Sequence, residues 1–200
     1  SNTEDIAVLI TGSELTMTPS SNFNGSGIIN VTANDGTVSS NTVTFTITVT
    51  STNDAPVLAS IPDQIIAEDQ SISVSLSATD EDADNITYTA QSDTSAISTF
   101  ITGSVLTMTP VGNFNGAATI SVTANDGTDD SGVETFVLTV TPVNDAPILA
   151  SISDQTTAED TPLTVSLSAT DVDGDLLTYS AVSNTEDIAV LITGSELTMT

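Results

Sequence analysis

The sequence predicts an all-β protein made of tandem β-sandwiches. Three observations support this fold class: apolar residues alternate with Ser and Thr at every second position, Asn-Gly and Asp-Gly turn signals separate the alternating runs, and the whole pattern returns after 91 residues. Alternation with a period of two is typical of strands that have one face on a core and the other in water. No segment shows the apolar stripe of an amphipathic helix.

In chain order, the alternation predicts strands at residues 43–49, 71–78, 118–124 and 136–140. In each of these segments Val, Ile, Leu, Phe or Ala occupies every second position, and Ser or Thr fills most of the positions between them. Thr on the water-facing side suits β-structure and adds solubility without charge.

Turn signals lie between these strands. The segment Asn125-Asp126-Gly127-Thr128 is predicted to form the turn before the last strand, and Asn115-Gly116 and Asn24-Gly25 mark a second turn in two copies of the repeat. Asn and Gly adopt the left-handed conformations that tight turns require. About seven short strands in a repeat of this length are typical of an immunoglobulin-like sandwich.

The repeat also predicts how the chain is divided. Residues 53–61 return almost unchanged as 144–152, and residues 1–18 are identical to 183–200, two periods away. Such periodicity is the signature of a tandem array. The predicted units are the C-terminal part of a repeat at 1–52, a complete repeat at 53–143 and the N-terminal part of the next repeat at 144–200.

Two interpretations of the partial units are open. In the first, the sequence is a window from a longer tandem array. In the second, the ends of neighbouring molecules complete each other. The repeated 18-residue segment favours the first interpretation, because its two copies would compete for one position in a completed unit.

Composition excludes several classes of function. The 200 residues include 27 Asp and Glu but no Lys, Arg, His or Cys. Without Cys and His there is no thiol nucleophile, no disulfide and no ordinary zinc site. Without Lys and Arg, nucleic acids and anionic membrane surfaces are repelled. The apolar runs are too short for membrane insertion. Only carboxylates could act as acid or base, so the chain is not expected to be an enzyme.

The acidic residues gather at strand ends, in four places of each repeat. Ca²⁺ requires six to eight oxygen ligands and prefers carboxylates, so this density predicts calcium binding. The alternative is that the acids are solvated charges that keep the array soluble. Their recurrence in both copies favours calcium. The candidate ligands are Asn53 and Asp54 or Asn144 and Asp145 in the linkers, Glu68 or Glu159 in a turn, Asp80, Asp82 and Asp84 or Asp171, Asp173 and Asp175 in a loop, and Asp35 or Asp126 in the Asn-Asp-Gly turn.

The predicted sandwich fold brings several of these candidate ligands close together. In a sandwich of this type, two loops share one end with the incoming linker. This arrangement places the loop 80–84 and the turn residue Asp126 close to Asn53-Asp54. An EF-hand is excluded, because the loop lacks the Gly and Glu that an EF-hand needs.

The units resemble bacterial cadherin-like tandem repeats of large secreted surface adhesins. The segments 53–56, 67–69, 78–82 and 122–127 carry the resemblance, which covers essentially the whole chain. It implies that calcium binds between successive domains. The preceding domain would offer Glu68 or Glu159, the linker Asp54 or Asp145, and the following domain Asp80 and Asp82 with Asp126, or Asp171 and Asp173.

One departure from the cadherin pattern concerns the number of ions. Cadherins carry an acidic motif before the sixth strand, whereas residues 109–115 of this chain contain no carboxylate. Fewer ions per junction are therefore expected than in a vertebrate cadherin.

The leading functional prediction is a calcium-rigidified, extracellular or cell-surface repeat array that acts as a spacer, fibre or adhesive stalk. Its expected partners are the neighbouring repeats of the same chain. The alternative is self-assembly, in which copies pack side by side or end to end into a filament, sheath or surface layer. A carbohydrate- or ice-binding module is less favoured, because only 4% of the residues are aromatic and Thr is ordinary on strand surfaces.

Overall fold

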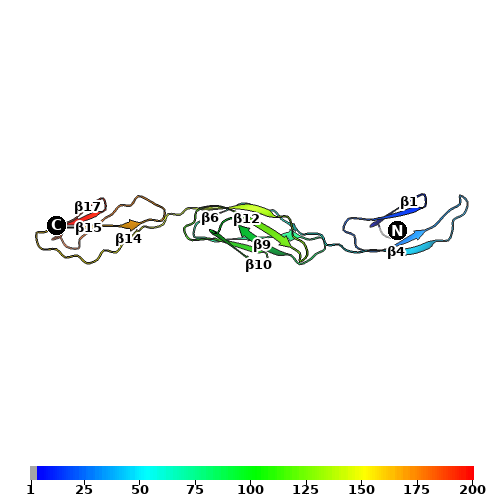
Figure 1. The fold of residues 1–200 in the computed structure, drawn as a ribbon, viewed down its shortest axis with the longest axis horizontal. Coiled ribbons are helices and arrows are strands. Elements are labelled where there is room, and N and C mark those ends of the chain that lie inside the picture. The colour runs from blue at the N-terminus through cyan, green and yellow to red at the C-terminus, as the bar shows by residue number, and fades with distance from the viewer. Residues whose placement is uncertain (1–3) are drawn as a thin grey trace.

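A computed structural model describes residues 4–200, and every regular element in this range is a β-strand. No described residue belongs to a helix that could cross a membrane. Three bodies lie in a row and are joined by extended linkers (Figure 1). We call them the N-terminal unit (residues 4–52), the middle unit (53–143) and the C-terminal unit (144–200). The all-β fold class predicted from the alternation is confirmed.

The middle unit is a sandwich of two sheets with a short two-stranded ribbon beside them. One sheet has the order β6-β13-β12-β9, and the other has the order β10-β11-β7. Neighbouring strands are antiparallel, except that β6 runs parallel to β13. The strands are β5 (Val57–Leu58), β6 (Gln64–Ala67), β7 (Ile72–Ser75), β8 (Ala78–Thr79), β9 (Thr87–Ser92), β10 (Ile97–Thr102), β11 (Val105–Pro110), β12 (Gly116–Asn125) and β13 (Glu134–Thr141).

The core of the middle unit lies between these two sheets. Leu106, Met108, Ile120 and Leu138 are completely buried. They come from β11, β12 and β13, in which every second side chain points inward, as the alternation requires. Burying such side chains is the main favourable term in the folding of this unit.

The two terminal units contain fewer strands and leave more apolar surface open. Phe45 is 37% exposed, whereas its counterpart Phe136 in the middle unit is 2% exposed. Each terminal unit lacks the strands that cover the same positions in the middle unit. Their strands are β1 (Ile6–Thr11), β2 (Glu14–Pro19), β3 (Gly25–Val31) and β4 (Val43–Val49), then β14 (Ile148–Leu149), β15 (Leu163–Ser166), β16 (Ala169–Thr170), β17 (Val190–Thr193) and β18 (Glu196–Met199).

Two local predictions need correction. The strand predicted at 71–78 is interrupted: β7 pairs with β11, whereas β8 pairs with β5, so the chain changes partner near Leu76. The alternation continues across the break, because Leu76 is still buried in the same core. The turn predicted at Asn115-Gly116 lies at Gly112-Asn113, where Asn113 has a φ of 59°, and Gly116 begins β12.

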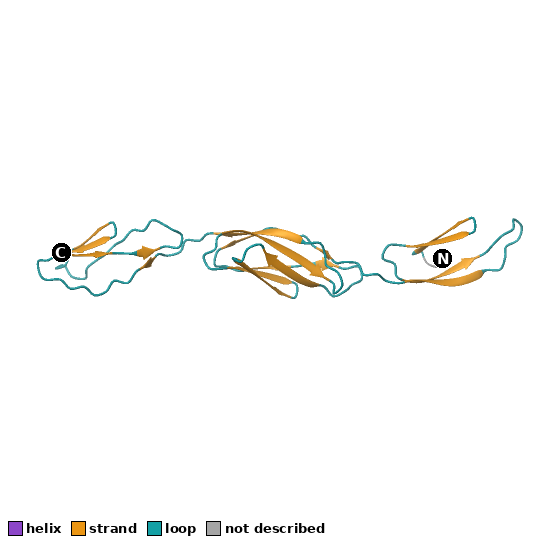
Figure 2. Ribbon diagram, in the orientation of Figure 1, coloured by secondary structure: helices purple, strands orange, loops and turns teal. Residues whose placement is uncertain are grey.

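Charge is separated from the sheets. All but three of the 27 acidic residues lie outside the strands, and those three, Glu14, Glu134 and Glu196, each occupy the first position of a strand. Strands occupy the middle of each unit and loops its ends (Figure 2). The carboxylates are therefore concentrated at the ends of the units, where the linkers join them.

Candidate metal centres at the repeat junctions

The loop after β8 folds back on its first residue. Oδ1 of Asp80 accepts hydrogen bonds from the N–H groups of Asp82 at 2.9 Å and Asp84 at 3.1 Å. Asp side chains favour such turns, and Ala83 completes this one with a left-handed φ of 62°. As a result, one carboxylate oxygen from each of the three Asp residues lies within 4.8 Å of the others.

The corresponding loop of the C-terminal unit has the same fold. Oδ1 of Asp171 accepts the N–H groups of Asp173 at 3.0 Å and Asp175 at 3.1 Å. Gly174 takes the left-handed position with a φ of 77°. The local sequence is therefore sufficient to form this loop in both units.

Both linkers are attached to this loop through the same hydrogen bond. The N–H of Asp54 donates to Oδ2 of Asp82 at 2.8 Å, and the N–H of Asp145 donates to Oδ2 of Asp173 at 2.7 Å. The middle carboxylate of each loop thus holds the linker Asp beside the other acids.

At the second junction, a carboxylate from the preceding repeat joins them. Glu68 follows β6 and is 3% exposed. Its Oε1 accepts the N–H of Val143 at 2.6 Å, which ties it to the linker. Carboxylate oxygens of Glu68, Asp145 and Asp173 lie within 4.8 Å of one another. The preceding repeat, the linker and the following repeat each contribute one acid. We call these three residues the junction cluster.

Asp145 is held in an unfavourable environment for a carboxylate. Burial raises its pKa, and the charges of Asp69, Asp173, Glu68 and Asp171 raise the pKa further. These acids come from both repeats that flank the linker. The chain contains no Lys, Arg or His that could balance them.

The junction cluster and the three loop acids Asp80, Asp82 and Asp84 both fit a hard divalent cation. Oδ2 of Asp145 and Oδ2 of Asp80 are buried without a hydrogen-bond partner. A buried polar atom without a partner costs free energy, and a cation would remove that cost. The donor set consists of carboxylate oxygens, which Ca²⁺ prefers, whereas Mg²⁺ retains its waters and is bound less well by such a site.

The first junction has a further contact between linker and turn. Nδ2 of Asn53 donates to Oδ2 of Asp126 and to Oδ2 of Asp129, both at 2.9 Å. Oδ1 of Asp126 accepts the N–H groups of Thr128 at 2.6 Å and Asp129 at 2.7 Å. The linker is therefore seated on the turn before β13.

These hydrogen bonds lower the pKa of Asp126. The largest contribution is the N–H of Asp129, followed by the Asn53 amide and the N–H of Thr128. Because the pKa is lower in the folded state than in the unfolded state, the bonds stabilise the fold above about pH 3.9. This stabilisation is lost as the pH falls through the folded-state pKa.

We therefore expect Asp126→Ala to lower the melting temperature at neutral pH and to have a smaller effect in acid. The control is Asp130→Ala, which removes from the same loop an exposed carboxylate that accepts one hydrogen bond, from Nδ2 of Asn125. Thermal unfolding of both variants, followed by circular dichroism across the acidic range, provides the measurement. Equal losses for the two variants, or a loss that does not change with pH, would contradict this role of Asp126.

Asp35 lies away from both junctions. Hydrogen bonds from the N–H of Val38, and then from the hydroxyl and N–H of Thr37, lower its pKa to about 2. Its turn precedes β4, and β4 leads into the linker, so the turn is at the opposite end of the N-terminal unit (Figure 1). The structure does not bring Asp35 to any of the other candidate ligands.

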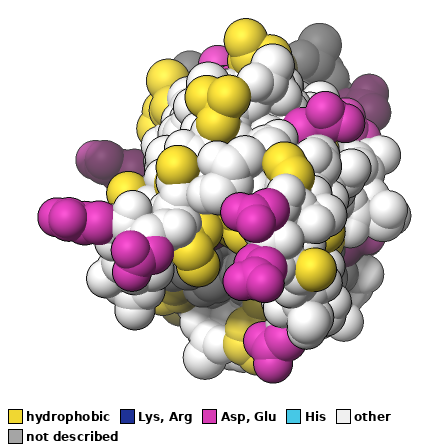
Figure 3. All heavy atoms as spheres, turned by 90° about the vertical axis from the view of Figure 1, so that its left-hand side faces the viewer, with side chains coloured by type: hydrophobic (Ala, Val, Ile, Leu, Met, Phe, Trp, Pro, Cys, Tyr) yellow, Lys and Arg dark blue, Asp and Glu magenta, His cyan; other side chains and the backbone are white. Residues whose placement is uncertain are grey.

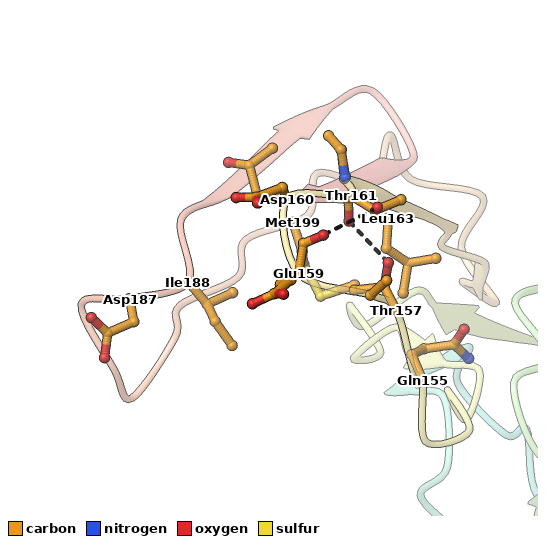
Figure 4. Close-up of a pocket in the computed structure, with 12 residues that line it drawn as sticks. Gln155, Thr157, Glu159, Asp160, Thr161, Leu163, Asp187, Ile188 and Met199 are labelled. Carbon is orange, nitrogen blue, oxygen red and sulfur yellow. Dashed lines mark hydrogen bonds between the residues drawn. The ribbon is translucent and has the colours of Figure 1, made fainter.

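Glu159 also lies away from the junctions. It lines a cavity of about 570 Å³ together with the apolar side chains of Leu163, Ile188 and Met199 (Figure 4). Met199 corresponds to Met108, which is fully buried in the middle unit. The cavity is therefore an uncovered inner face of the C-terminal unit and not a ligand pocket.

Asn144 and Asp175 stand at the margin of the second junction. Nδ2 of Asn144 donates to the backbone oxygen of Asp145 at 3.0 Å. The side chain of Asp175 is exposed, and only its N–H is bonded to the loop. Neither side chain belongs to the junction cluster.

Two further acids act at the junctions, although the repeat pattern did not mark them as candidate ligands. Asp129 shares the amide of Asn53 with Asp126, but Val38 occupies its position in the earlier copy, so the repeat gives no signal. Asp69 acts on Asp145 through its charge. The Glu-Asp pair to which Asp69 belongs recurs in the next repeat, and this recurrence was the available signal.

Several solved structures are similar to this chain. The EC1-2 fragment of human mucin-like protocadherin is 20% identical, with a TM-score of 0.46, over 70% of this chain and 80% of that one. Extracellular cadherin domains 1-4 of protocadherin gamma B7 are 17% identical, with a TM-score of 0.46, over 97% and 55%. Domains 1-5 of protocadherin gamma B2 are 19% identical, with a TM-score of 0.49, over 97% and 43%. The chain thus spans about half the length of the two longer structures.

The family is shown by the sequence itself. No curated protein sequence matches the chain. The family model described as bacterial Ig domain matches residues 53–141 and 144–200, well over half of the chain. Each match begins at a linker Asn-Asp pair. The predicted class of bacterial tandem repeat is thereby confirmed, and the chain belongs to the family of bacterial Ig domains.

Proposed function

We propose that the chain is an extracellular spacer in which Ca²⁺ holds neighbouring repeats in line. Repeats of the bacterial Ig family support a structural or adhesive role, are typically not enzymes, and suggest an extracellular or surface location. The observation that carries the proposal is the junction cluster of Glu68, Asp145 and Asp173. A cation held by these three residues would connect one repeat, the linker and the next repeat at the same time.

The residues of the chain set up this connection before any ion binds. The Val143 N–H orients Glu68, and the Asp145 N–H orients Asp173. The remaining carboxylate oxygens are then left close together and repel one another. Bound Ca²⁺ supplies the positive charge that this group lacks, so it favours the arrangement in which the three acids converge.

The corresponding linker and loop residues would form a site at the first junction, where the sequence offers no counterpart of Glu68. Asp54 takes the position of Asp145 and donates its N–H to Asp82, while carboxylate oxygens of Asp80, Asp82 and Asp84 lie within 4.8 Å of one another. Both linkers thus attach their Asp to the same acidic loop of the following repeat.

Stiff joints are useful to an extracellular array. Domains connected by short linkers move relative to each other by default, because their interfaces are small. A cation at each joint would remove this freedom and keep the array extended. A quasi-one-dimensional chain of this kind is suited to holding a terminal domain far from the cell surface.

The test is a calorimetric Ca²⁺ titration of the 200-residue chain and of Glu68→Gln. Gln keeps the size of Glu and an oxygen for the Val143 N–H, but it removes the charge. We expect the affinity of one site to fall by about tenfold or more, since calcium affinity follows the number of ligand charges.

The matched control is Glu81→Gln. Glu81 is exposed and lies within the acidic loop, but the next repeat has Val172 in its place, so a carboxylate is not required there. We expect the titration of this variant to equal that of the wild type. The proposal is wrong if the wild type binds no Ca²⁺, or if the two variants lose affinity equally.

A further inference from the structure

An early strand and the last strand of the middle unit lie side by side and run in the same direction. β6 stands at the edge of its sheet and pairs with β13. The register joins Gln64 to Leu138 and Ala67 to Thr141. The incoming linker lies before β6 and the outgoing linker follows β13, and the two linkers leave the unit at opposite ends (Figure 1). The two ends of the unit are therefore fastened to each other through this pair of strands.

Hydrogen bonds extend this pairing beyond both ends of β6. Before β6, the N–H of Val137 donates to Oδ1 of Asp63 at 2.8 Å. After β6, the N–H of Glu68 donates to the backbone oxygen of Thr141 at 2.9 Å, and the N–H of Val143 donates to Oε1 of Glu68 at 2.6 Å. The bonds thus continue from the start of β6 into the outgoing linker. We call them, together with the β6–β13 pairing, the parallel contact.

The direction of the strands decides how this contact responds to a pull along the array. Such a pull draws the chain before β6 toward the first junction and the chain after β13 toward the second. The hydrogen bonds of a parallel pair are evenly spaced along the strands. Two parallel strands that are drawn in opposite directions must slide, so all these bonds are strained at the same time. A hairpin pulled from its open end instead separates one residue pair after another.

Only hydrogen bonds and apolar packing hold the two strands together. The chain has no Lys, Arg or His, so no side-chain ion pair can contribute. The view along the row of units shows acidic side chains and no basic ones (Figure 3). Leu138 and Val140 anchor β13 in the core, whereas β6 is at the edge and only partly buried. Under tension, β6 is therefore the strand that would move.

We propose that the middle unit carries tension along the array and that the parallel contact sets its resistance. β5 comes before β6 on the path from the first linker, but it has only two residue pairs with β8. The β5–β8 pairing should therefore open first, after which the parallel contact bears the tension. The two acids of the contact recur in the next repeat as Asp154 and Glu159. This function goes beyond that of a spacer and does not require Ca²⁺.

The test is to stretch the 200-residue chain between its two termini at constant force, in the presence of a chelator. The middle unit gives the largest gain in length, because residues 53–143 outnumber those of either flanking unit. Its lifetime under force measures the rate of unfolding. Asp63→Ala removes the acceptor of the Val137 N–H. The lifetime should shorten by about two- to tenfold, the effect of one hydrogen bond on a rate.

Two variants serve as controls. Asp93 is also exposed and also accepts a strand N–H, that of Thr119, at 3.0 Å, but this bond joins the end of β9 to β12 and not β6 to β13. Asp93→Ala should lower the melting temperature about as much as Asp63→Ala but leave the lifetime under force unchanged. Asp63→Asn keeps an oxygen for the Val137 N–H, so it should keep the wild-type lifetime.

A second measurement changes the direction of the pull. The chain has no Cys, so Thr128→Cys creates a single attachment point, in the exposed turn where Asp126 binds the incoming linker. Tension between the N-terminus and this point acts on one end of the unit. It peels β5 and β6 away one residue pair at a time. The middle unit should then unfold at a lower force than when it is pulled by both termini.

The outcomes that contradict this proposal are clear-cut. Asp63→Ala and Asp93→Ala could shorten the lifetime equally, or neither could shorten it. The two pulling directions could also require the same force. Circular dichroism of the variants, whose changed side chains are all exposed, checks that the fold is kept. Because a chelator is present throughout, these results do not depend on whether the proposed calcium sites exist.

Discussion

Removal of divalent cations by a chelator should lower the melting temperature of the chain and loosen both linkers. A ligand present at about a hundredfold excess over its Kd stabilises the folded state by about 2.7 kcal/mol. In a domain of about this size, each kcal/mol corresponds to a shift of about 4–8 °C. Loss of calcium also leaves the acids of the junction cluster to repel one another, so the repeats should bend apart.

Scanning calorimetry and small-angle scattering, before and after chelation, measure these two effects. The melting temperature should fall, and the scattering should change from that of a straight particle to that of a flexible one with a shorter maximum dimension. Excess Ca²⁺ should reverse both changes, whereas Mg²⁺ should do so less well. If neither the melting nor the scattering responds to chelation, calcium does not stiffen this chain.

Asp145→Asn should raise the melting temperature of the chain without calcium and lower it with calcium. In the metal-free chain, burial and four neighbouring carboxylates disfavour the charged form of Asp145 and raise its pKa. A carboxyl group with a raised folded-state pKa destabilises the fold at neutral pH, and this cost disappears as the pH falls below the unfolded value of about 3.9. Asn removes the charge, so the metal-free variant should melt at a higher temperature than the wild type.

With calcium present, the same substitution removes a proposed ligand. The variant should then bind Ca²⁺ more weakly, by about tenfold or more, and melt below the wild type. The control is Asp154→Asn, which neutralises an exposed carboxylate outside the cluster and should follow the wild type in both conditions. Melting curves of the three proteins, with calcium and with a chelator, test the change of sign. A shift in the same direction in both conditions would contradict the proposed role of Asp145.

Much of the local structure could be predicted from sequence. The strand predicted at 43–49 coincides with β4, and those at 118–124 and 136–140 lie within β12 and β13. These predictions succeed because a strand with one wet face must alternate, and the 91-residue repeat shows the pattern more than once. The acidic loops are likewise local, because Asp80 accepts hydrogen bonds from N–H groups two and four residues further along its own loop.

Which strands pair with each other could not be predicted from the sequence. Alternation marks 71–78 as one strand, but pairing divides it, because β7 joins β11 and β8 joins β5. The pattern of β10 shows two faces, and only the packing of its sheet onto the core buries Ile97 and leaves Phe100 in solvent. The strands that pair with β7 and β8 lie far away from them in the sequence.

The sequence by itself determined the strands, the repeat, the excess of negative charge and the loops in which that charge is placed. Only the tertiary structure decided which acids meet. Glu68 reaches Asp145 and Asp173 because β6 pairs with β13, whose end leads directly into the linker. Asp35 and Glu159 hold the same positions in their units as Asp126 and Glu68, but they lie at the two ends of the row of units, where neither linker of the chain reaches them. The reason is physical: short-range hydrogen bonds shape a loop, but the packing of whole sheets determines where that loop points.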